Sequence, residues 1–207
     1  MAEVAQIDPG RLLAVSKLRK LADEGHAEAQ FRLGLAHGNG EGVPLDQLAA
    51  AQWVGKAAAQ GHAEAQLNYG WFLANGYGLE ADEAQASAWF LRAAEQGLVK
   101  AQYVVATMYR FGQYGQARDL AAALQWYQRA ADQGYARAQF ALGRLVMEGR
   151  HVAQDDATAL QWMMLAQANG SERAEEAVEI LLKRMPPEQV AAVRAGMLGD
   201  GEPSAGG

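Results

Sequence analysis

Tryptophan recurs along this 207-residue chain at an almost constant interval. Four of the five tryptophans are separated by 36, 37 and 36 residues, namely Trp53, Trp89, Trp126 and Trp162. Other columns keep the same register: alanine lies three residues before and four residues after each of these tryptophans, aspartate seven before and glycine eight after. A fixed period of roughly 20–50 residues is typical of repeat proteins, in which each unit packs on its neighbours. The period therefore constrains the fold more than any other feature.

Each repeat is predicted to contain two helices. The alanines and the tryptophan share one helix face, where small residues allow close approach and the tryptophan is expected to fill the gap. The aspartate is a suitable N-cap and the glycine a suitable C-cap of this helix, which we call helix B. A second helix, helix A, is expected to begin at a recurring Ala-Gln pair and to end at glycine. The expected starts are Ala29, Ala65, Ala101 and Ala138, and the expected ends are Gly40, Gly76, Gly112 and Gly149.

The composition supports an all-α fold, because the chain contains 44 alanines, 23 glycines and only 5 prolines. We predict a solenoid of four full helix pairs with a period of 36–37 residues and a helical cap at each end. The expected boundaries are a flexible N-terminus (1–10), a cap helix (11–24), repeats at 25–60, 61–96, 97–133 and 134–169, a C-terminal helical cap (170–198) and a disordered tail (199–207).

The repeated unit resembles a known family. The segments AEAQFRLG (27–34), GEGVPLD (40–46) and WVGKAAAQG (53–61) are similar to a Sel-one-like repeat (SLR), a helix-pair repeat related to the tetratricopeptide class, and WFLRAAEQG (89–97) fits equally closely. The resemblance covers roughly residues 11–185. It implies a right-handed superhelix with a concave groove, and a function as adaptor or scaffold for protein partners. Some secreted members carry a disulfide in each repeat, whereas this chain contains no cysteine.

The composition also argues against several classes of function. Without cysteine there is no disulfide framework, thiolate zinc site or cysteine nucleophile. A net charge of −6 disfavours nucleic-acid binding, and no apolar run is long enough to span a membrane. The first nine residues do not resemble a secretory signal, so a cytoplasmic location is expected. No cofactor is expected.

No motif indicates catalysis or metal binding. His26 and His62 occupy the same repeat position, in Gly-His-Ala-Glu, and are interpreted as loop fillers because the cysteine half of a zinc deaminase site is absent. The glycine-rich stretch 38–42 follows a predicted helix rather than a strand, so it is interpreted as a turn and not a phosphate loop. We predict that the chain is not an enzyme.

Candidate binding residues are those that break the repeat on helix A, which lines the concave face in tetratricopeptide geometry. Trp71 is the one tryptophan outside the repeating column, and it is either a binding hot spot or a packing residue. Asn39 and Asn75 could hydrogen-bond a peptide or cap a helix end. The groove candidates are Leu35, Asn39, Trp71, Asn75, Tyr103, Thr107, Arg110, Phe111 and Arg144.

Charge differs between the repeats. Glu28 and Glu64 lie in the first two, whereas basic side chains gather on helix A of the last two, at Lys100, Arg110, Arg137 and Arg144. This distribution favours a protein or peptide partner with an acidic segment, although ordinary surface charge is the alternative. We expect an interaction adaptor or scaffold. The alternatives are a dedicated inhibitor or immunity protein that masks a toxin, and an enzyme with an unrecognised site.

Overall fold

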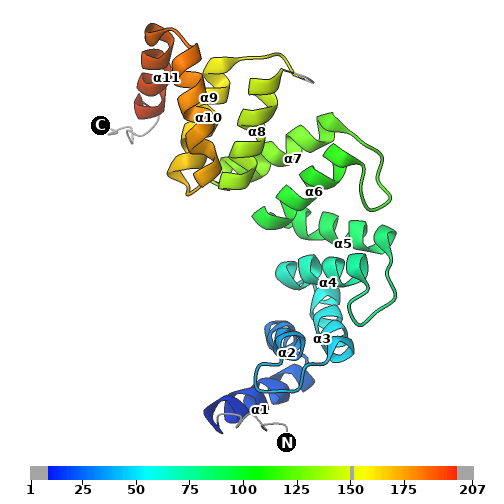
Figure 1. Ribbon diagram of the computed structural model, residues 1–207. Helices are drawn as coiled ribbons and strands as arrows, with labels where there is room; N and C mark the ends of the chain where they lie inside the picture. The colour runs from blue at the N-terminus through cyan, green and yellow to red at the C-terminus, as the bar shows by residue number, and fades with distance from the viewer. Residues whose placement is uncertain (1–8, 150–151, 200–207) are drawn as a thin grey trace, which may run out of the picture. The chain divides into compact units, whose positions relative to one another are not determined.

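The computed structural model describes residues 9–149 and 152–199, and this part of the chain consists of helices and connecting loops without a strand. The expectations for residues 1–8 and 200–207 lie outside the described residues. The helices form two compact units that divide near the end of the sixth helix. The all-α repeat architecture predicted from the 36–37-residue period is therefore confirmed (Figure 1).

Unit 1 contains the first two helix pairs and most of the next helix A. Its helices are α1 (Pro9–Asp23), α2 (Ala27–Asn39), α3 (Gln47–Ala59), α4 (Ala63–Asn75), α5 (Glu83–Glu95) and α6 (Val99–Phe111). The last three residues of α6, 109–111, belong to unit 2. The helices A are α2, α4 and α6, and the helices B are α3 and α5. Within the unit, α1 packs on α2, α2 on α3, α3 on α4, and α4 on α5.

Unit 2 contains the remaining helices. They are α7 (Leu120–Asp132), α8 (Ala136–Glu148), α9 (Asp156–Ala168), α10 (Glu172–Arg184) and α11 (Pro187–Gly199). Here α8 packs on α9, α10 and α11 pack on the same helix α9, and α7 packs on α8. None of the described helices is both long and apolar enough to cross a bilayer.

The aspartate N-caps of the helices B are confirmed, whereas each helix B has its C-cap one residue before the predicted glycine, at Gln60, Gln96, Gln133 or Asn169. The carboxylates of Asp46, Asp82, Asp119 and Asp155 each accept a backbone N–H from the first turn of a helix B, at 2.8–3.2 Å. Each helix A that precedes a helix B ends at a glycine with a positive φ of 64–70°, a conformation that an L side chain adopts only with strain. Aspartate and glycine therefore set the repeat boundaries locally.

Each helix A begins two residues earlier than predicted, at Ala27, Ala63, Val99 and Ala136. The preceding residue has extended φ and ψ, as an N-cap does, but its type differs from repeat to repeat, so no common capping residue marks the start. Only His62 among these four residues caps with its side chain: its Nδ1 accepts the N–H of Ala65 at 3.1 Å.

The residue after each tryptophan, rather than the tryptophan, lies at the centre of the core. Val54, Phe90, Tyr127 and Met163 are at most 1% exposed. Three of them lie against glycines of helix A: a Cβ on Gly34 would come within 2.6 Å of Val54, one on Gly70 within 2.6 Å of Phe90, and one on Gly143 within 3.1 Å of Met163. A recurring glycine thus gives space for a larger side chain on helix B.

The tryptophans lie at the edge of the core rather than at its centre: all four are only partly buried, and Trp53 and Trp89 pack against the core clusters of neighbouring helices. Lys56, Arg92 and Arg129, one turn later, hold their cationic groups 4.0–4.4 Å from the tryptophan ring centroids. An indole suits this edge position because it has a large apolar surface, while its face attracts a cation.

Candidate interaction surfaces

A buried glutamine links neighbouring repeats. Gln30, Gln66, Gln102 and Gln139 occupy one column and are at most 5% exposed. The Nε2 of each donates to a backbone carbonyl eight residues earlier, at the end of the preceding helix, at 3.0–3.4 Å. The sequence analysis missed this role, although a polar residue repeated beside a buried alanine was the available signal.

A second amide completes the link. Gln60 donates to Oε1 of Gln30 at 2.7 Å, Gln96 donates to Gln66 at 2.6 Å, and Asn169 donates to Gln139 at 3.0 Å. Both ends of each of these buried amides are therefore satisfied, which avoids the cost of a buried polar group without a partner. These glutamines are scaffold, and they leave other positions for binding.

Trp71 lies in an aromatic cluster of unit 1. Its ring centroid is 4.8 Å from that of Phe90 and 6.2 Å from that of Tyr114, and the side chain is partly buried. Tyr114 belongs to the loop that carries the extra residue of the third repeat, and it has a φ of +54°. Burial, together with the negative charge of Glu83, raises the pKa of Tyr114. The structure thus gives Trp71 a packing role that the sequence left undecided.

The loop after α6 is also tied to α5 by a hydrogen bond. Gln116 donates from Nε2 to Oγ of Ser87 at 2.9 Å, and Ser87 is 1% exposed. The loop therefore folds back on the repeat before it. The 37-residue spacing was the signal for this feature, but the spacing alone does not say where an inserted residue packs.

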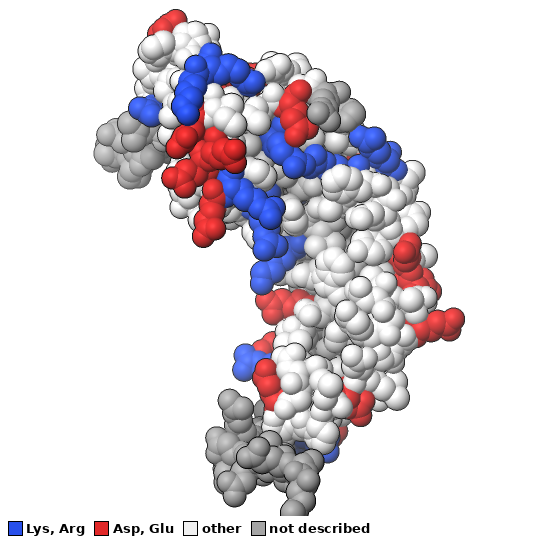
Figure 2. All heavy atoms as spheres, in the orientation of Figure 1, with Lys and Arg blue, Asp and Glu red and all other residues white. Residues whose placement is uncertain are grey.

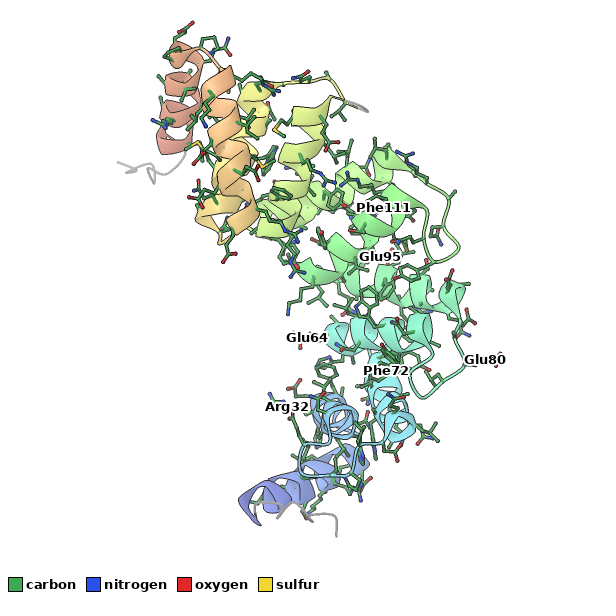
Figure 3. All side chains as sticks on the ribbon, in the orientation of Figure 1. Arg32, Glu64, Phe72, Glu80, Glu95 and Phe111 are labelled. Carbon is green, nitrogen blue, oxygen red and sulfur yellow. The ribbon has the colours of Figure 1, made fainter. Side chains whose placement is uncertain are left out.

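A mostly apolar hollow of about 280 Å³ lies between the first two full repeats of unit 1. Leu35 of α2, Ala50 of α3, Phe72 of α4 and Tyr77 of the following loop form its apolar walls. Phe72 and Tyr77 are in edge-to-face contact at 6.5 Å, and Tyr77 is 49% exposed. Figure 3 labels Phe72 on α4. The hollow brings together two sequence candidates, Leu35 and Asn39.

The two candidate asparagines differ in their contacts. Asn39 lines the hollow and donates to Oε1 of Glu41 at 3.0 Å, whereas Asn75 donates to the carbonyl of Trp71 in its own last turn at 2.8 Å. Asn75 thus takes part in the end of its own helix. Asn39 remains an exposed polar group at the rim of the hollow.

The remaining candidates lie on α6 and α8. Thr107, partly buried, donates through Oγ1 to the carbonyl of Tyr103 at 2.9 Å. Arg110 holds its guanidinium 5.1 Å from the ring centroid of Phe111, which is 57% exposed. The Nε of Arg144 lies 3.4 Å from Oε1 of Glu148, one turn later on the same helix.

Basic side chains are concentrated in the last two repeats, as the sequence indicated. Figure 2 shows Lys and Arg side chains gathered over α7 and α8, to which Arg129, Arg137 and Arg144 belong. In unit 1, the carboxylate of Glu28 pairs with Arg32 and accepts from Nε2 of His62 at 2.8 Å. The hydrogen bond from His62, followed by that from Arg32, lowers the pKa of Glu28.

Among the described residues, no group of three or more His, Asp or Glu side chains is arranged to hold a metal ion.

Comparison with known proteins places these surfaces on a common scaffold. A family model described as the Sel1 repeat matches residues 27–62, 63–98, 99–135 and 136–171. The chain belongs to the Sel1 repeat family. The resemblance drawn from its sequence is therefore confirmed. No curated protein matches the chain.

Two solved structures share 35% sequence identity with this Sel1 repeat protein. One is c5321, a protective antigen present in uropathogenic Escherichia coli strains and described as displaying an SLR fold; its TM-score is 0.76, and the match covers 80% of this chain and 35% of c5321. The other is a Sel1 repeat protein from Oxalobacter formigenes, with a TM-score of 0.74 and coverage of 79% and 66% respectively. The chain thus spans about a third of the first protein and just under two thirds of the second.

A third structure is the immunity protein Pa5087 from Pseudomonas aeruginosa, with 21% identity, a TM-score of 0.54 and coverage of 84% of this chain and 63% of that protein. At this identity the likeness shows the shared fold alone.

Proposed function

We propose that this Sel1 repeat protein is a non-catalytic adaptor or scaffold that presents preformed helical surfaces to a protein or peptide partner. Sel1 repeat proteins generally mediate protein–protein interactions. The observation that supports a binding role most directly is the pair at the end of α6, where Phe111 is 57% exposed beside the guanidinium of Arg110. Aromatic and arginine side chains of this kind dominate the binding energy of many interfaces.

We propose that the partner of this surface carries an acidic segment. Arg110 and the exposed Arg137 bring positive charge to unit 2, and the side chain of Arg144 is 41% exposed although it pairs with Glu148. A guanidinium binds a carboxylate in two parallel hydrogen bonds, which gives both specificity and affinity. Among the candidates predicted from the sequence, Arg110, Phe111 and Arg144 belong to this proposed surface. Leu35 and Asn39 line the hollow of unit 1 instead.

The proposal is tested by affinity capture from the native lysate, with the wild-type chain and the triple variant Arg110→Glu/Phe111→Ala/Arg144→Glu as baits. The control is Arg173→Glu, which reverses an exposed charge on α10. A partner that is retained by the wild type and the control but lost by the triple variant is expected. Its affinity should also fall as salt rises towards physiological strength, because exposed charges are then screened.

The outcomes separate the alternatives. If no protein is retained even at low salt, or if the triple variant retains every partner, the proposed surface is wrong. If one very tight partner is captured and its enzymatic or toxic activity is blocked by stoichiometric addition of this chain, the inhibitor function is correct instead.

A further inference from the structure

We call the contact of α2 and α3 with α4 the first junction, and that of α4 and α5 with the loop after α6 the second junction. The first junction lacks a large aromatic side chain that the second junction has. Counting one period of 36 residues along the chain, Leu35 corresponds to Trp71, Gly38 to Ala74 and Ala50 to Ala86. At the second junction the indole of Trp71 lies against Phe90 and Tyr114. At the first junction the smaller Leu35 borders the open hollow of about 280 Å³.

The loops at the two junctions also correspond. The loop after α4 brings Tyr77 to the hollow, as the loop after α6 brings Tyr114 to Trp71. The backbone positions that receive an indole in one repeat thus surround open space in the other. A large aromatic side chain supplied from outside fits the chemistry of this space, because its walls are aliphatic and aromatic carbon with edge-to-face geometry available.

The rim of the hollow is polar and its surroundings are acidic. Asn39, Gln47 and Asn68 provide amide groups at the edge. Glu41 lies beside Asn39 on the loop between α2 and α3, and Glu80 lies on the loop that carries Tyr77; Figure 3 shows Glu80 with its side chain directed away from the helices.

The cations of this region are already engaged. Residues 25–96 contain eight Asp and Glu but only three Lys and Arg. Arg32 pairs with Glu28, Lys56 lies over Trp53, and Arg92 lies over Trp89. No lysine or arginine lines the hollow among the described residues, and the excess of acidic over basic residues in 25–96 favours a positively charged ligand.

We propose that this hollow binds a partner segment in which a tryptophan or similarly large aromatic side chain is flanked by lysine or arginine. The aromatic ring enters between Leu35, Phe72 and Tyr77, and the flanking cations lie near Glu41 and Glu80. This inference deepens the proposed function, on which it rests, by assigning a second surface and the chemistry of its ligand. The first surface, around Arg110 and Phe111, has the opposite charge preference.

The experiment uses the full chain and a dye-labelled, end-capped peptide KKWKK, with KKAKK and EEWEE as matched probes. Titration at low salt is expected to give saturable binding of KKWKK, at least tenfold weaker binding of KKAKK and weaker binding of EEWEE. A dissociation constant for KKWKK above about 1 mM, equal binding of KKAKK, or a preference for EEWEE would overturn the proposal.

The decisive variant copies the second junction into the first. Leu35→Trp should fill the hollow and weaken KKWKK binding at least tenfold while the melting temperature stays at or above that of the wild type. Unchanged binding by a folded Leu35→Trp variant would contradict the proposed location. If that variant does not fold, Tyr77→Ala tests the same wall at a half-exposed loop position, with Ile180→Ala, an equally exposed apolar side chain of α10, as its control.

The charge requirement is tested separately. Glu41→Gln/Glu80→Gln should weaken KKWKK binding several-fold at low salt, and the difference should shrink as salt rises. Glu95→Gln removes one exposed charge on α5, outside the hollow, and should leave binding unchanged. The peptide assay uses purified components and lysate capture does not, so the two tests can fail independently. Absence of KKWKK binding alone would contradict the proposed hollow, and absence of lysate capture alone would contradict the surface around Arg110.

Discussion

The two junctions of unit 1 share a backbone plan but differ in what occupies it. At the second junction, Trp71, Phe90 and Tyr114 form a closed aromatic cluster. At the first, Leu35 and Gly38 border a hollow, and a polar pair of Glu28 with His62 takes the place where the next repeat has Glu64 and Leu98. The comparison teaches that one scaffold position can serve stability in one repeat and be left available for a ligand in the next.

The largest effect is expected from closing the space beside Phe90. A Cβ on Gly70 would come within 2.6 Å of a ring that is fully buried and cannot move aside. Gly70→Ala should therefore lower the free energy of unfolding by about 3 kcal/mol, at the upper end of overpacking costs. Chemical denaturation measures this change.

A contrasting variant is Gly38→Ala at the first junction, one turn after Gly34, the counterpart of Gly70. There a Cβ would lie 3.6 Å from Ala50, an ordinary contact, and alanine is the better helix former by about 1 kcal/mol. A neutral or stabilising result is expected. Equal destabilisation by the two variants would contradict the close approach argued for Gly70.

A smaller effect is expected when the second junction is converted towards the first. Trp71→Leu removes a partly buried indole from Phe90 and Tyr114, and should cost about 2 kcal/mol. It should also raise the mobility of the loop that carries Tyr114, which amide hydrogen exchange can measure. Unchanged exchange at residues 113–118 would mean that the mobility of this loop does not depend on the aromatic cluster.

Removing the buried glutamine should lower the free energy of unfolding by the same amount at both junctions. Gln30→Ala and Gln66→Ala each leave a buried carbonyl without its amide partner and should each cost about 1–2 kcal/mol. Thermal unfolding of the two variants under identical conditions tests the similarity. A large difference would mean that the hollow weakens the first link.

The smallest effect concerns the pair that only the first junction has. Because His62 and Arg32 lower the pKa of Glu28, its ionised form stabilises the fold above the ordinary value of 4.5, and this contribution is lost as the pH falls through the lowered pKa. Glu28→Gln should slightly lower the melting temperature at pH 7, and the difference should shrink as the pH falls below 4.5 and through the lowered pKa.

The sequence predicted much of this fold because the repeat places a recurring cue at the start of each helix B and at the end of each helix A. The capping aspartates and the glycines with positive φ act within a few residues, so their effect can be inferred locally. The core position after each tryptophan was missed because Val54, Phe90, Tyr127 and Met163 vary in type, whereas the conspicuous tryptophans at the edge do not. The tryptophan column was therefore a poor guide to depth of burial, although the recurring alanines are buried.

The candidate sites were less predictable, since they depend on space rather than on residue type. Leu35 and Trp71 were both candidates and lie one period apart, but only the packing of Tyr77 and Tyr114 shows that one position borders a hollow and the other does not. The buried amides were missed for a related reason. The hydrogen bond from Gln60 to Gln30 joins residues 30 positions apart, a distance that no local pattern reveals.

Those amides have a consequence for how the array comes apart. Each buried glutamine bonds to the helix before it. The side-chain amides of Gln60, Gln96 and Asn169, at the end of the helix after it, donate to the oxygens of Gln30, Gln66 and Gln139. If one helix pair unfolded alone, a buried amide group would lose its hydrogen-bond partner in apolar surroundings. Neighbouring pairs therefore favour unfolding together over unfolding one by one. Fraying from an end is therefore discouraged, and each unit resists piecemeal attack by proteases more than its short helices alone would suggest.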